Sequence, residues 1–511
     1  MSKSIVSFYL IATKPQFSFY KWQQSYWKRR GIPGPDATLF FGNMHELTDV
    51  EKPGVLILRE WTKVRFRKQI IFTYYTRCFQ KYGKVYGFQE GIRKTLVISD
   101  PNMLQELFIK KFDDFYGRKN MALVGDLEND RKVHVFEARG VRWKRLRSIS
   151  NPTFTANSLK KIRNTVEDSA IQLLKLMEIN ADKEAFNIHR YYQEYTLDVI
   201  SRIAMGEKES KMFQNNRIKL VQKFFLRSFR NPIFYLASIM PIFHIPLRRL
   251  FIIIGGLKEL PILVLMNSLT KTVHERIEKR AKDIEEGTHS GEPEDFIDLF
   301  LDARTEEKFD NCVEFSRSGI QVTKSLTTEE IVAQCLVFLL AGFDTTANSL
   351  AYTSFLLAKH PEVMRKLQDE IDICCTEENI NYETLNRLKY MDCVIKESLR
   401  IYPLASFASS RRCMRTTTLG EVEVREGEFV MADTWTVHYD KTLWGDDANE
   451  FRPERLVVKA VTTCEFSLLA EIQKYKCFIF QNELKLIGST TISPKEVTIY
   501  LQKRSFSEIH L

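Results

Sequence analysis

Paired metal-binding motifs are absent from this sequence. Its nine cysteines include no C-x-x-C pair and their number is odd, and its nine histidines include no H-E-x-x-H pattern. A disulfide framework and a zinc site of the common types therefore have little support, and we expect reduced thiols. Fixed-period repeats and low-complexity tracts are also absent, which argues against a solenoid or a disordered chain.

The N-terminal region has no apolar run long enough to cross a bilayer. Residues 5–13 are apolar, but Lys14 and Pro15 follow, whereas a spanning helix needs about 20 apolar residues. Aromatic and then basic residues come next, a pattern typical of a membrane interface: Tyr20, Trp22, Tyr26, Trp27, Lys28, Arg29 and Arg30. We therefore expect residues 1–30 to form a weak membrane anchor. A frayed, aromatic-rich arm is the alternative.

Long runs of one charge are missing too. The 75 basic and 65 acidic residues are spread along the chain and give a net charge of +10, which predicts a mildly basic, mixed surface. This distribution does not favour nucleic-acid binding, although a basic face for an acidic protein partner remains open. With 44% hydrophobic residues and only 15 prolines among 511 residues, the chain can bury a large core.

The patterns that are present predict a mainly α chain with a small β region. The two prolines and two glycines of residues 31–36 predict a stiff hinge before a single domain over residues 37–511. Alternation over residues 84–101 predicts a hairpin. Helical spacing recurs in six later segments: Ala156 to Met177, Gln193 to Met205, Asn267 to Glu286, Thr327 to Lys359, Pro361 to Thr376 and Tyr390 to Ile401.

The apolar segment from Leu250 to Met266 is interrupted by Lys258, Glu259 and Pro261, so it is not a membrane span. Burial in the core is one interpretation of this segment. The other is a surface element that dips into a membrane interface.

The stretch Ala341-Gly-Phe-Asp-Thr-Thr346 forms a polar notch in an otherwise apolar helix. Gly342 costs the helix about 1 kcal/mol relative to alanine, but it lets a large group approach the backbone. Thr345 can bond a carbonyl of the preceding turn, and Asp344 beside it completes a pair that can carry protons. A satisfied polar notch in a helix bundle is the alternative.

Other charged groups stand at informative spacings. Glu397 and Arg400 are three residues apart and share a helix face, and Arg455 can close a network with them. Trp143 and Arg147 are four residues apart, which places an indole N–H and a guanidinium on one face, where they can hold a carboxylate. Each pattern is weak alone, but their order and spacing together are specific.

From Arg30 to Arg504 these motifs resemble the cytochrome P450 family, in particular animal microsomal haem-thiolate monooxygenases. The resemblance implies the P450 fold, which is mainly α with a small β region. It also implies roles by position: Asp344 and Thr345 as the catalytic pair that delivers protons during oxygen activation, Glu397, Arg400 and Arg455 as a structural triad behind the haem, and Trp143, Arg147 and Arg411 as ligands of the haem propionates.

The resemblance further implies an NADPH-dependent monooxygenase that inserts one oxygen atom from O2 into a small apolar substrate. Its cofactor would be haem b, and its electrons would come from a flavoprotein reductase. The expected location is the cytoplasmic face of the endoplasmic reticulum membrane, with no nucleic-acid partner. Nothing in the sequence identifies the substrate, because the residues of a pocket cannot be placed from one sequence.

The sequence departs from the family where the haem ligand should lie. The family's cysteine thiolate comes from a loop of pattern F-x-x-G-x-R-x-C-x-G, but no glycine occurs between Gly445 and Gly488. The Cys-ligand loop is therefore lacking. Cys464, nine residues after Arg455, is the candidate metal ligand, and a cysteine of no special role is the alternative. A catalytically inactive relative or a defective gene model is the alternative to an active enzyme.

A second departure is an insertion at residues 64–80, V-R-F-R-K-Q-I-I-F-T-Y-Y-T-R-C-F-Q. These seventeen residues separate two segments that are nearly contiguous in the family. The first and last codons can match splice sites, which suggests a translated intron. The alternative is a lineage-specific insertion in a surface helix.

Overall fold

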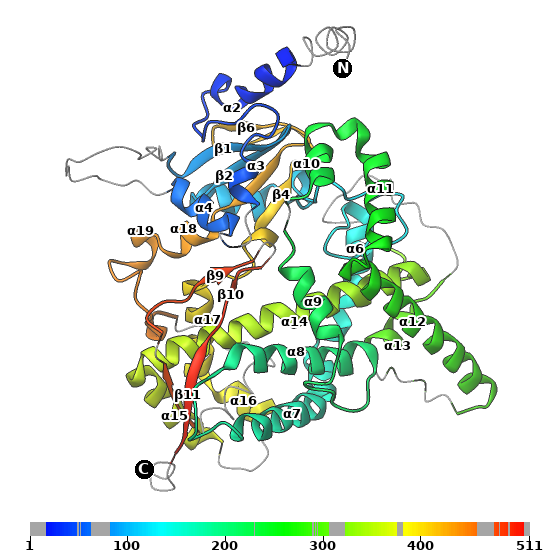
Figure 1. Cartoon of the computed structure of the whole chain (residues 1–511), viewed down its shortest axis with the longest axis vertical. Helices are drawn as coiled ribbons and strands as arrows, with labels where there is room; N and C mark the ends of the chain where they lie inside the picture. The colour runs from blue at the N-terminus through cyan, green and yellow to red at the C-terminus, as the bar shows by residue number, and fades with distance from the viewer. Residues whose placement is uncertain are drawn as a thin grey trace.

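The computed structural model describes residues 17–48, 51, 53–62, 82–228, 230–288, 291, 293, 295–305, 322–375, 382–456, 475–479, 481–488 and 491–504. Helices dominate, and the main sheet lies at one end of the molecule (Figure 1). The helices are α2 (Tyr26–Arg29), α3 (Met44–Leu47), α4 (Gly54–Thr62), α5 (Pro101–Gln105), α6 (Gly140–Ser150), α7 (Ala156–Glu178), α8 (Ile188–Met205), α9 (Arg217–Phe225), α10 (Pro232–Ile239), α11 (His244–Leu257), α12 (Pro261–Glu285), α13 (Phe296–Asp302), α14 (Thr328–Lys359), α15 (Pro361–Cys374), α16 (Tyr382–Arg387), α17 (Lys389–Ile401), α18 (Thr434–His438) and α19 (Lys441–Trp444). Short helical turns are η1 (Glu106–Lys110), η2 (Phe112–Asp114), η3 (Asn151–Phe154), η4 (Pro241–Phe243), η5 (Ser406–Ser409) and η6 (Pro453–Leu456).

All six helices predicted from spacing are present. Three of them begin earlier than predicted: α17 by one residue, at Lys389, and α8 and α12 by more, for local reasons. Helix α8 begins at Ile188 because the Asn187 side chain caps it by accepting from the His189 amide. Helix α12 begins at Pro261, which suits the first helical position because proline has no amide to leave unpaired. The segment over residues 84–101, with its alternating apolar residues, forms the predicted hairpin.

The main sheet has the order β1-β2-β7-β4. Its strands are β1 (Val85–Glu90), β2 (Arg93–Ile98), β7 (Phe429–Ala432) and β4 (Ser410–Arg412), and only the β2–β7 pair is parallel. The smaller sheets are β3 (Phe186–Asn187) with β11 (Thr498–Lys503) and β8 (Tyr475–Ile479), β5 (Thr417–Leu419) with β6 (Val422–Val424), and β9 (Leu486–Ile487) with β10 (Ser493–Pro494). Helix α4 covers one face of the main sheet through Ile57, Leu58 and Trp61.

Helix α14 crosses the middle of the molecule and packs against α8 (Figure 1). It begins with a capping box in which the Thr327 hydroxyl accepts from the Glu330 amide and the Glu330 carboxylate accepts from the Thr327 amide. In the described part of the chain, α14 alone is long and apolar enough by itself to cross a membrane, but most of it is buried in the core. Its apolar character therefore reflects the protein core.

Part of the segment from Leu250 to Met266 lies in the core and part lies at the surface. Leu265, on α12, is buried in the core. On α11, by contrast, Ile253 is 62% exposed and Leu257 is 82% exposed, and Ile242 just before this helix is 83% exposed. This part of the segment therefore lies at the surface and not in the core.

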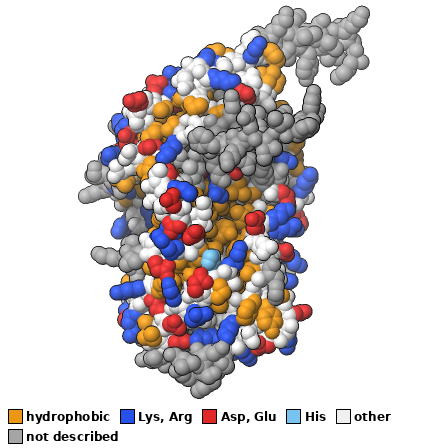
Figure 2. Space-filling view, turned by 90° about the vertical axis from the view of Figure 1, so that its left-hand side faces the viewer, with side chains coloured by type: hydrophobic (Ala, Val, Ile, Leu, Met, Phe, Trp, Pro, Cys, Tyr) orange, Lys and Arg blue, Asp and Glu red, His pale blue; other side chains and the backbone are white. Residues whose placement is uncertain are grey.

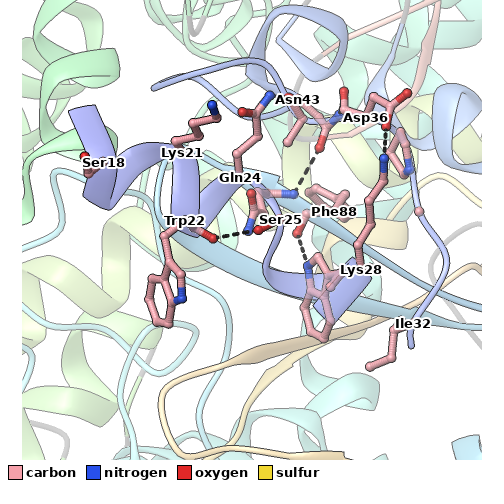
Figure 3. A pocket seen from close by; sticks show the side chains of 16 residues that line it. Ser18, Lys21, Trp22, Gln24, Ser25, Lys28, Ile32, Asp36, Asn43 and Phe88 are labelled. Atoms are coloured by element: carbon pink, nitrogen blue, oxygen red, sulfur yellow. Dashed lines mark hydrogen bonds and ion pairs between the residues drawn. The ribbon is translucent and has the colours of Figure 1, made fainter. Parts of the chain in front are cut away.

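The last residues of the expected anchor, which spans residues 1–30, pack onto the main sheet. Tyr26 and Trp27 are buried in the core, so they do not belong to a membrane-facing belt. Trp22, by contrast, is 54% exposed. The Trp27 indole donates to the Phe88 carbonyl at 3.0 Å, and its ring lies on Gly87 so closely that a Cβ there would overlap it. A cavity of about 460 Å³ opens between this arm and β1, and Lys28 reaches across it toward Asp36 (Figure 3).

The face that carries α18 and α19 is not uniformly polar. Hydrophobic side chains gather in a hollow near its centre, and charged side chains surround them (Figure 2). Residues 64–80, Cys464 and residues 1–16 lie outside the described residues.

Candidate haem and oxygen-activation site

The polar notch of α14 faces open space although the helix is otherwise buried. Ala341 is exposed and Thr345 is half-buried, whereas Phe343 and Asp344 are buried. The group that approaches Gly342 is helix α8: a Cβ on Gly342 would lie 2.9 Å from Cδ1 of Ile200. The glycine therefore serves close helix packing, and the large group that was expected to approach it is a neighbouring helix.

The Asp344 carboxylate is buried, and one of its two oxygens accepts three hydrogen bonds. Its Oδ2 accepts from Asn348 Nδ2 at 2.8 Å, from the Thr491 hydroxyl, and from Ser493 Oγ at 3.3 Å. Burial raises the pKa of Asp344 to about 6, although these three hydrogen bonds favour the charged form. The carboxylate can therefore take up and release a proton close to neutral pH.

His189 extends this network from α8. Asn348 donates through Nδ2 to Asp344 and to Ser493, so its Oδ1 is the atom that faces His189 Nε2 at 2.8 Å and must accept from it. Burial lowers the pKa of His189 to about 4, and the Asn348 contact offsets this only in part. The ring is therefore neutral at physiological pH and carries its proton on Nε2.

Thr345 points its hydroxyl back along its own helix. Its Oγ1 donates to the Ala341 carbonyl at 2.6 Å, as expected from the sequence for a threonine at this position. Because Ala341 and Thr345 are both accessible, this hydrogen bond borders the open side of α14. Asp344 and Thr345 thus occupy different faces of the helix, one turned to the core and one to the open side.

Glu397, Arg400 and Arg455 form one buried ion cluster. Arg400 contacts both carboxylate oxygens of Glu397 at 2.8 Å, and Arg455 Nε lies 2.9 Å from Glu397 Oε1. The two arginines also donate to main-chain carbonyls, such as those of Ala448 and Trp444. Bidentate contacts of this kind fix geometry as well as charge. The cluster ties α17 to the segment just before residue 457.

Three arginines converge near the expected propionate site without an acidic partner. Burial lowers the pKa of Arg118, as does the nearby charge of Arg147. Burial likewise lowers the pKa of Arg411 to about 10, with a further contribution from Arg118. Within the described residues, none of the three forms an ion pair with a carboxylate, and the buried Nε of Arg118 has no hydrogen-bond partner. Positive charges this close together, without a carboxylate partner, are expected to bind an anion.

Helix α6 carries four further residues of this site: Arg142, Trp143, Arg145 and Arg147. Arg142 and Arg145 bind the Glu330 carboxylate, with closest distances of 2.9 and 2.7 Å, and so fasten α6 to the start of α14. Arg147 extends to the exposed side of α6. Trp143 is half-buried and its ring centroid lies 5.7 Å from that of Phe112.

The described cysteines do not converge on the notch. Cys413 is buried, donates to the Arg415 carbonyl at 3.0 Å, and has its pKa raised to about 11 by burial. Burial similarly raises the pKa of Cys335 and of Cys477 to about 12. Thiols of this kind stay protonated and resemble small core residues, not metal ligands.

Several participants were not predicted from the sequence: Arg118, His189, Asn348, Thr491 and Ser493. Arg118 follows a turn with no distinctive motif. Thr491 and Ser493 lie more than 140 residues from Asp344, so no local spacing could reveal them. Asn348 is the exception, because it stands four residues after Asp344 on a predicted helix and so had to lie beside it.

Comparison with known proteins agrees with this geometry. A family model described as Cytochrome P450 matches residues 51–466. The chain belongs to the cytochrome P450 family. It is 42% identical to the Caenorhabditis elegans cytochrome P450 CYP13A4 over 521 positions, covering 95% of this chain and 96% of the relative. It is 45% identical to CYP13A1 of the same organism over 448 positions, covering 86% of this chain and 82% of the relative.

The fold agrees with that of a cytochrome P450, mainly helical with a small strand content. Members of this family are haem-thiolate monooxygenases in general, and they draw electrons from a redox partner to oxidise apolar substrates. The alignment with CYP13A4 holds more positions, 521, than this chain has residues, 511. The relative therefore carries residues that have no counterpart here.

The described residues fit one side of a haem and not the other. The arginine cluster of Arg118, Arg147 and Arg411 suits the two propionates, because it is short of negative charge. The described cysteines offer no thiolate beside the open face of α14. A thiolate ligand for the iron would have to come from outside the described residues.

Proposed function

We propose that this chain is a monooxygenase that binds haem b and inserts one oxygen atom from O2 into a small apolar substrate. The observation that carries the proposal is the cluster of half-buried Arg118 and Arg411 with Arg147 at its exposed edge, which has no carboxylate partner among the described residues. Two propionates would neutralise it, with Trp143 beside them. Once bound, haem supplies the oxidising chemistry of the family, and the thiolate ligand donates electron density to its iron.

The protein's own part in the reaction is proton supply. Asp344 holds a proton near neutral pH at a carboxyl group that is shielded from solvent, and Thr345 lies at the open side of the same helix turn. A rotation of the Asp344 side chain away from Asn348 would pass the proton toward Thr345 Oγ1. General acids tuned toward the working pH transfer protons most effectively.

Glu397, Arg400 and Arg455 have a structural role in this proposal. They would hold the segment around residue 455 against α17, so that the chain enters the cofactor region at a fixed place. Cys464 is the proposed iron ligand. Residues 1–30 are the proposed anchor, residues 31–36 the hinge and residues 37–511 the single catalytic domain.

A membrane surface is the proposed location, on the cytoplasmic face of the endoplasmic reticulum, with an NADPH-dependent flavoprotein reductase as electron donor. The exposed apolar residues Ile242, Ile253 and Leu257 support membrane contact. The helix pair over Pro232–Ile239 and Pro241–Leu257 is apolar enough to span but is bent by 120°. That shape suits shallow insertion into one leaflet rather than a crossing.

A specific observation favours a second candidate, a P450-like protein that cannot ligate haem. No glycine occurs over residues 446–487, where the family's ligand loop needs two, and the chain lacks residues that CYP13A4 contains. A skipped exon would produce this loss, and a retained intron would produce residues 64–80. Sequencing the transcripts decides both points: messages that all carry codons 64–80 would rule out the intron.

The reduced carbon monoxide difference spectrum of the purified chain tests the monooxygenase. A red-shifted Soret band would establish a thiolate-ligated haem. Loss of that band in Cys464→Ser, but not in the control Cys374→Ser, would assign the ligand. A folded chain without haem absorbance would overturn the first proposal and favour the inactive relative.

A further inference from the structure

A second cavity, of about 130 Å³, lies on the face of the main sheet that α4 covers. Apolar side chains form most of its wall, including Leu58, Phe88 and Met431. Three charged residues also line it: Glu90, Arg93 and Lys119. The cavity is smaller than the pockets of about 300–1,000 Å³ that hold drug-sized ligands, and its apolar wall with a few convergent charges suits a slender amphipathic ligand.

This cavity adjoins the polar notch of α14. Thr491 and Ile492 line it, and the Thr491 hydroxyl donates to the Asp344 carboxylate. Phe407, another lining residue, stacks on Phe136 with the ring planes 25° apart, and the Arg118 guanidinium lies over Phe136. A molecule in the cavity would therefore reach the border of the proposed haem site.

The three charges do not balance. Lys119 is only 6% exposed, and its ammonium pairs with Glu90 and donates to Thr95 Oγ1 at 3.0 Å. Arg93 donates to the Asn120 carbonyl and lies 4.9 Å from the centroid of the Phe429 ring. Two cations thus share one carboxylate, which leaves one positive charge in excess.

Both cations retain hydrogen-bonding capacity. A guanidinium has five N–H donors and an ammonium has three. Within the described part of the chain, Arg93 has a single acceptor, the Asn120 carbonyl, and Lys119 has two, Glu90 and Thr95.

The surroundings do not neutralise the excess. Burial lowers the pKa of Arg93, Glu90 opposes this shift, and the neighbouring charge of Arg412 adds to it. Arg412 pairs with Phe429 in the sheet, which places it on the same sheet face as this cavity.

We propose that the cavity selects a substrate with an apolar chain that ends in a carboxylate, such as a fatty acid. The carboxylate would lie between Arg93 and Lys119, and the chain would extend along Phe88 and Phe407 toward Ile492. A monoanion matches the one surplus positive charge among the residues that line the cavity. This inference rests on the proposed function only in treating the bound molecule as the substrate.

Equilibrium binding to the purified full-length chain tests the proposal without any turnover. Decanoic acid and methyl decanoate share the same chain and differ in charge, and titration calorimetry at low salt gives both affinities. The acid should bind about tenfold tighter than the ester, since a charge-assisted contact of ordinary strength corresponds to at least that factor. Arg93→Gln should abolish the preference and leave the affinity for the ester unchanged.

A second variant acts in the opposite direction. Glu90→Gln removes the competing carboxylate, so decanoic acid should bind more tightly while methyl decanoate is unaffected. Arg425→Gln is the matched control, because Arg425 is exposed and pairs with Glu423 at the surface. Equal affinity for the acid and the ester in the wild-type chain overturns the proposal, and so does a Glu90→Gln variant that binds the acid no better.

The outcome is independent of the haem question. A chain that lacks haem but prefers the acid would refute the monooxygenase and keep the carboxylate site. A chain that binds haem but does not prefer the acid would refute the carboxylate site and leave the monooxygenase proposal standing.

Discussion

Nδ2 of Asn348 lies 2.8 Å from Oδ2 of Asp344, and this contact sets the orientation of the Asn348 amide. With its nitrogen side facing Asp344, the amide turns its oxygen to His189, which must then donate. A neutral histidine and a readily protonated aspartate therefore stand on either side of one amide. Their effects on stability have opposite dependence on pH.

Asp344→Asn should change how stability depends on pH. Folded Asp344 keeps its proton up to about pH 6, whereas unfolded Asp344 loses it near 3.8. The wild-type protein should therefore lose about 3 kcal/mol of stability from this group as pH rises from about 4 to 6, a loss that persists above pH 6. Relative to wild type, the variant should gain stability over that range, measured by denaturant unfolding at pH 5 and pH 7.5.

Asp446→Asn provides the control for this measurement, because Asp446 is fully exposed. Its difference from wild type should be the same at both pH values. An Asp344→Asn curve parallel to wild type would show that the carboxyl group has no raised pKa in the folded protein.

His189→Gln should change the pH dependence with the opposite sign. The pKa of His189 falls from 6.5 to about 4 on folding, so its contribution is complete above pH 6.5 and is lost as pH falls through 4. That contribution is about 3 kcal/mol. Glutamine can still donate to Asn348, so the variant should resist acid better than wild type. Thermal midpoints at pH 7.5 and pH 5 measure this, with exposed His274→Gln as the control.

Glu397→Gln should destabilise the fold strongly. Glu397 is fully buried between Arg400 and Arg455, so its neutralisation leaves the Arg400 guanidinium in the core without a counter-charge and leaves Arg455 with Asp447 alone. Breaking one partner of such a cluster costs about 3–5 kcal/mol. Glu423→Gln, which disrupts surface ion pairs with Arg30 and Arg425, should cost less than about 1 kcal/mol. Urea midpoints compare the two, and equal losses would contradict the expected role of the triad.

Arg118→Leu should separate the stability of the protein from its capacity to bind haem. In the haem-free protein the substitution removes a buried cation beside Arg147 and Arg411, so the thermal midpoint should hold or rise. Haem incorporation, measured as haemochrome per protein, should fall by about tenfold because a charge-assisted contact to a propionate is lost. A variant that keeps its full haem content would show that the cluster does not serve the cofactor.

The sequence predicted best what depends on short spacings. The helix over Thr328–Lys359 and the shared face of Glu397 and Arg400 follow from periodicity, and both are present. The closure by Arg455 was also predicted, and it forms. At Gly342 the sequence predicted a close neighbour but could not identify it, because a glycine in a helix admits any close neighbour and only the packing shows that this one is Ile200.

What could not be predicted depends on contacts between distant segments. Thr491 reaches Asp344 because β9 and β10 return the chain to α14, a matter of topology that leaves no local pattern. Tyr26 and Trp27 resembled interfacial aromatics in the sequence, but both are buried against the sheet, where the Trp27 ring packs on Gly87. Composition alone does not distinguish these two environments.

Strand β4 places two adjacent arginines on opposite sides of the main sheet. Arg411 pairs with Val430 and faces the cluster that includes Arg118, whereas Arg412 pairs with Phe429 on the side of Arg93. Two residues that are adjacent in sequence thus contribute positive charge to two different sites, the proposed propionate site and the carboxylate cavity. Inserting or deleting a single residue ahead of Ser410 would exchange the two side chains. A shift in the register of β4 would therefore disturb both sites at once. The two sites can change independently only by substitution of single residues.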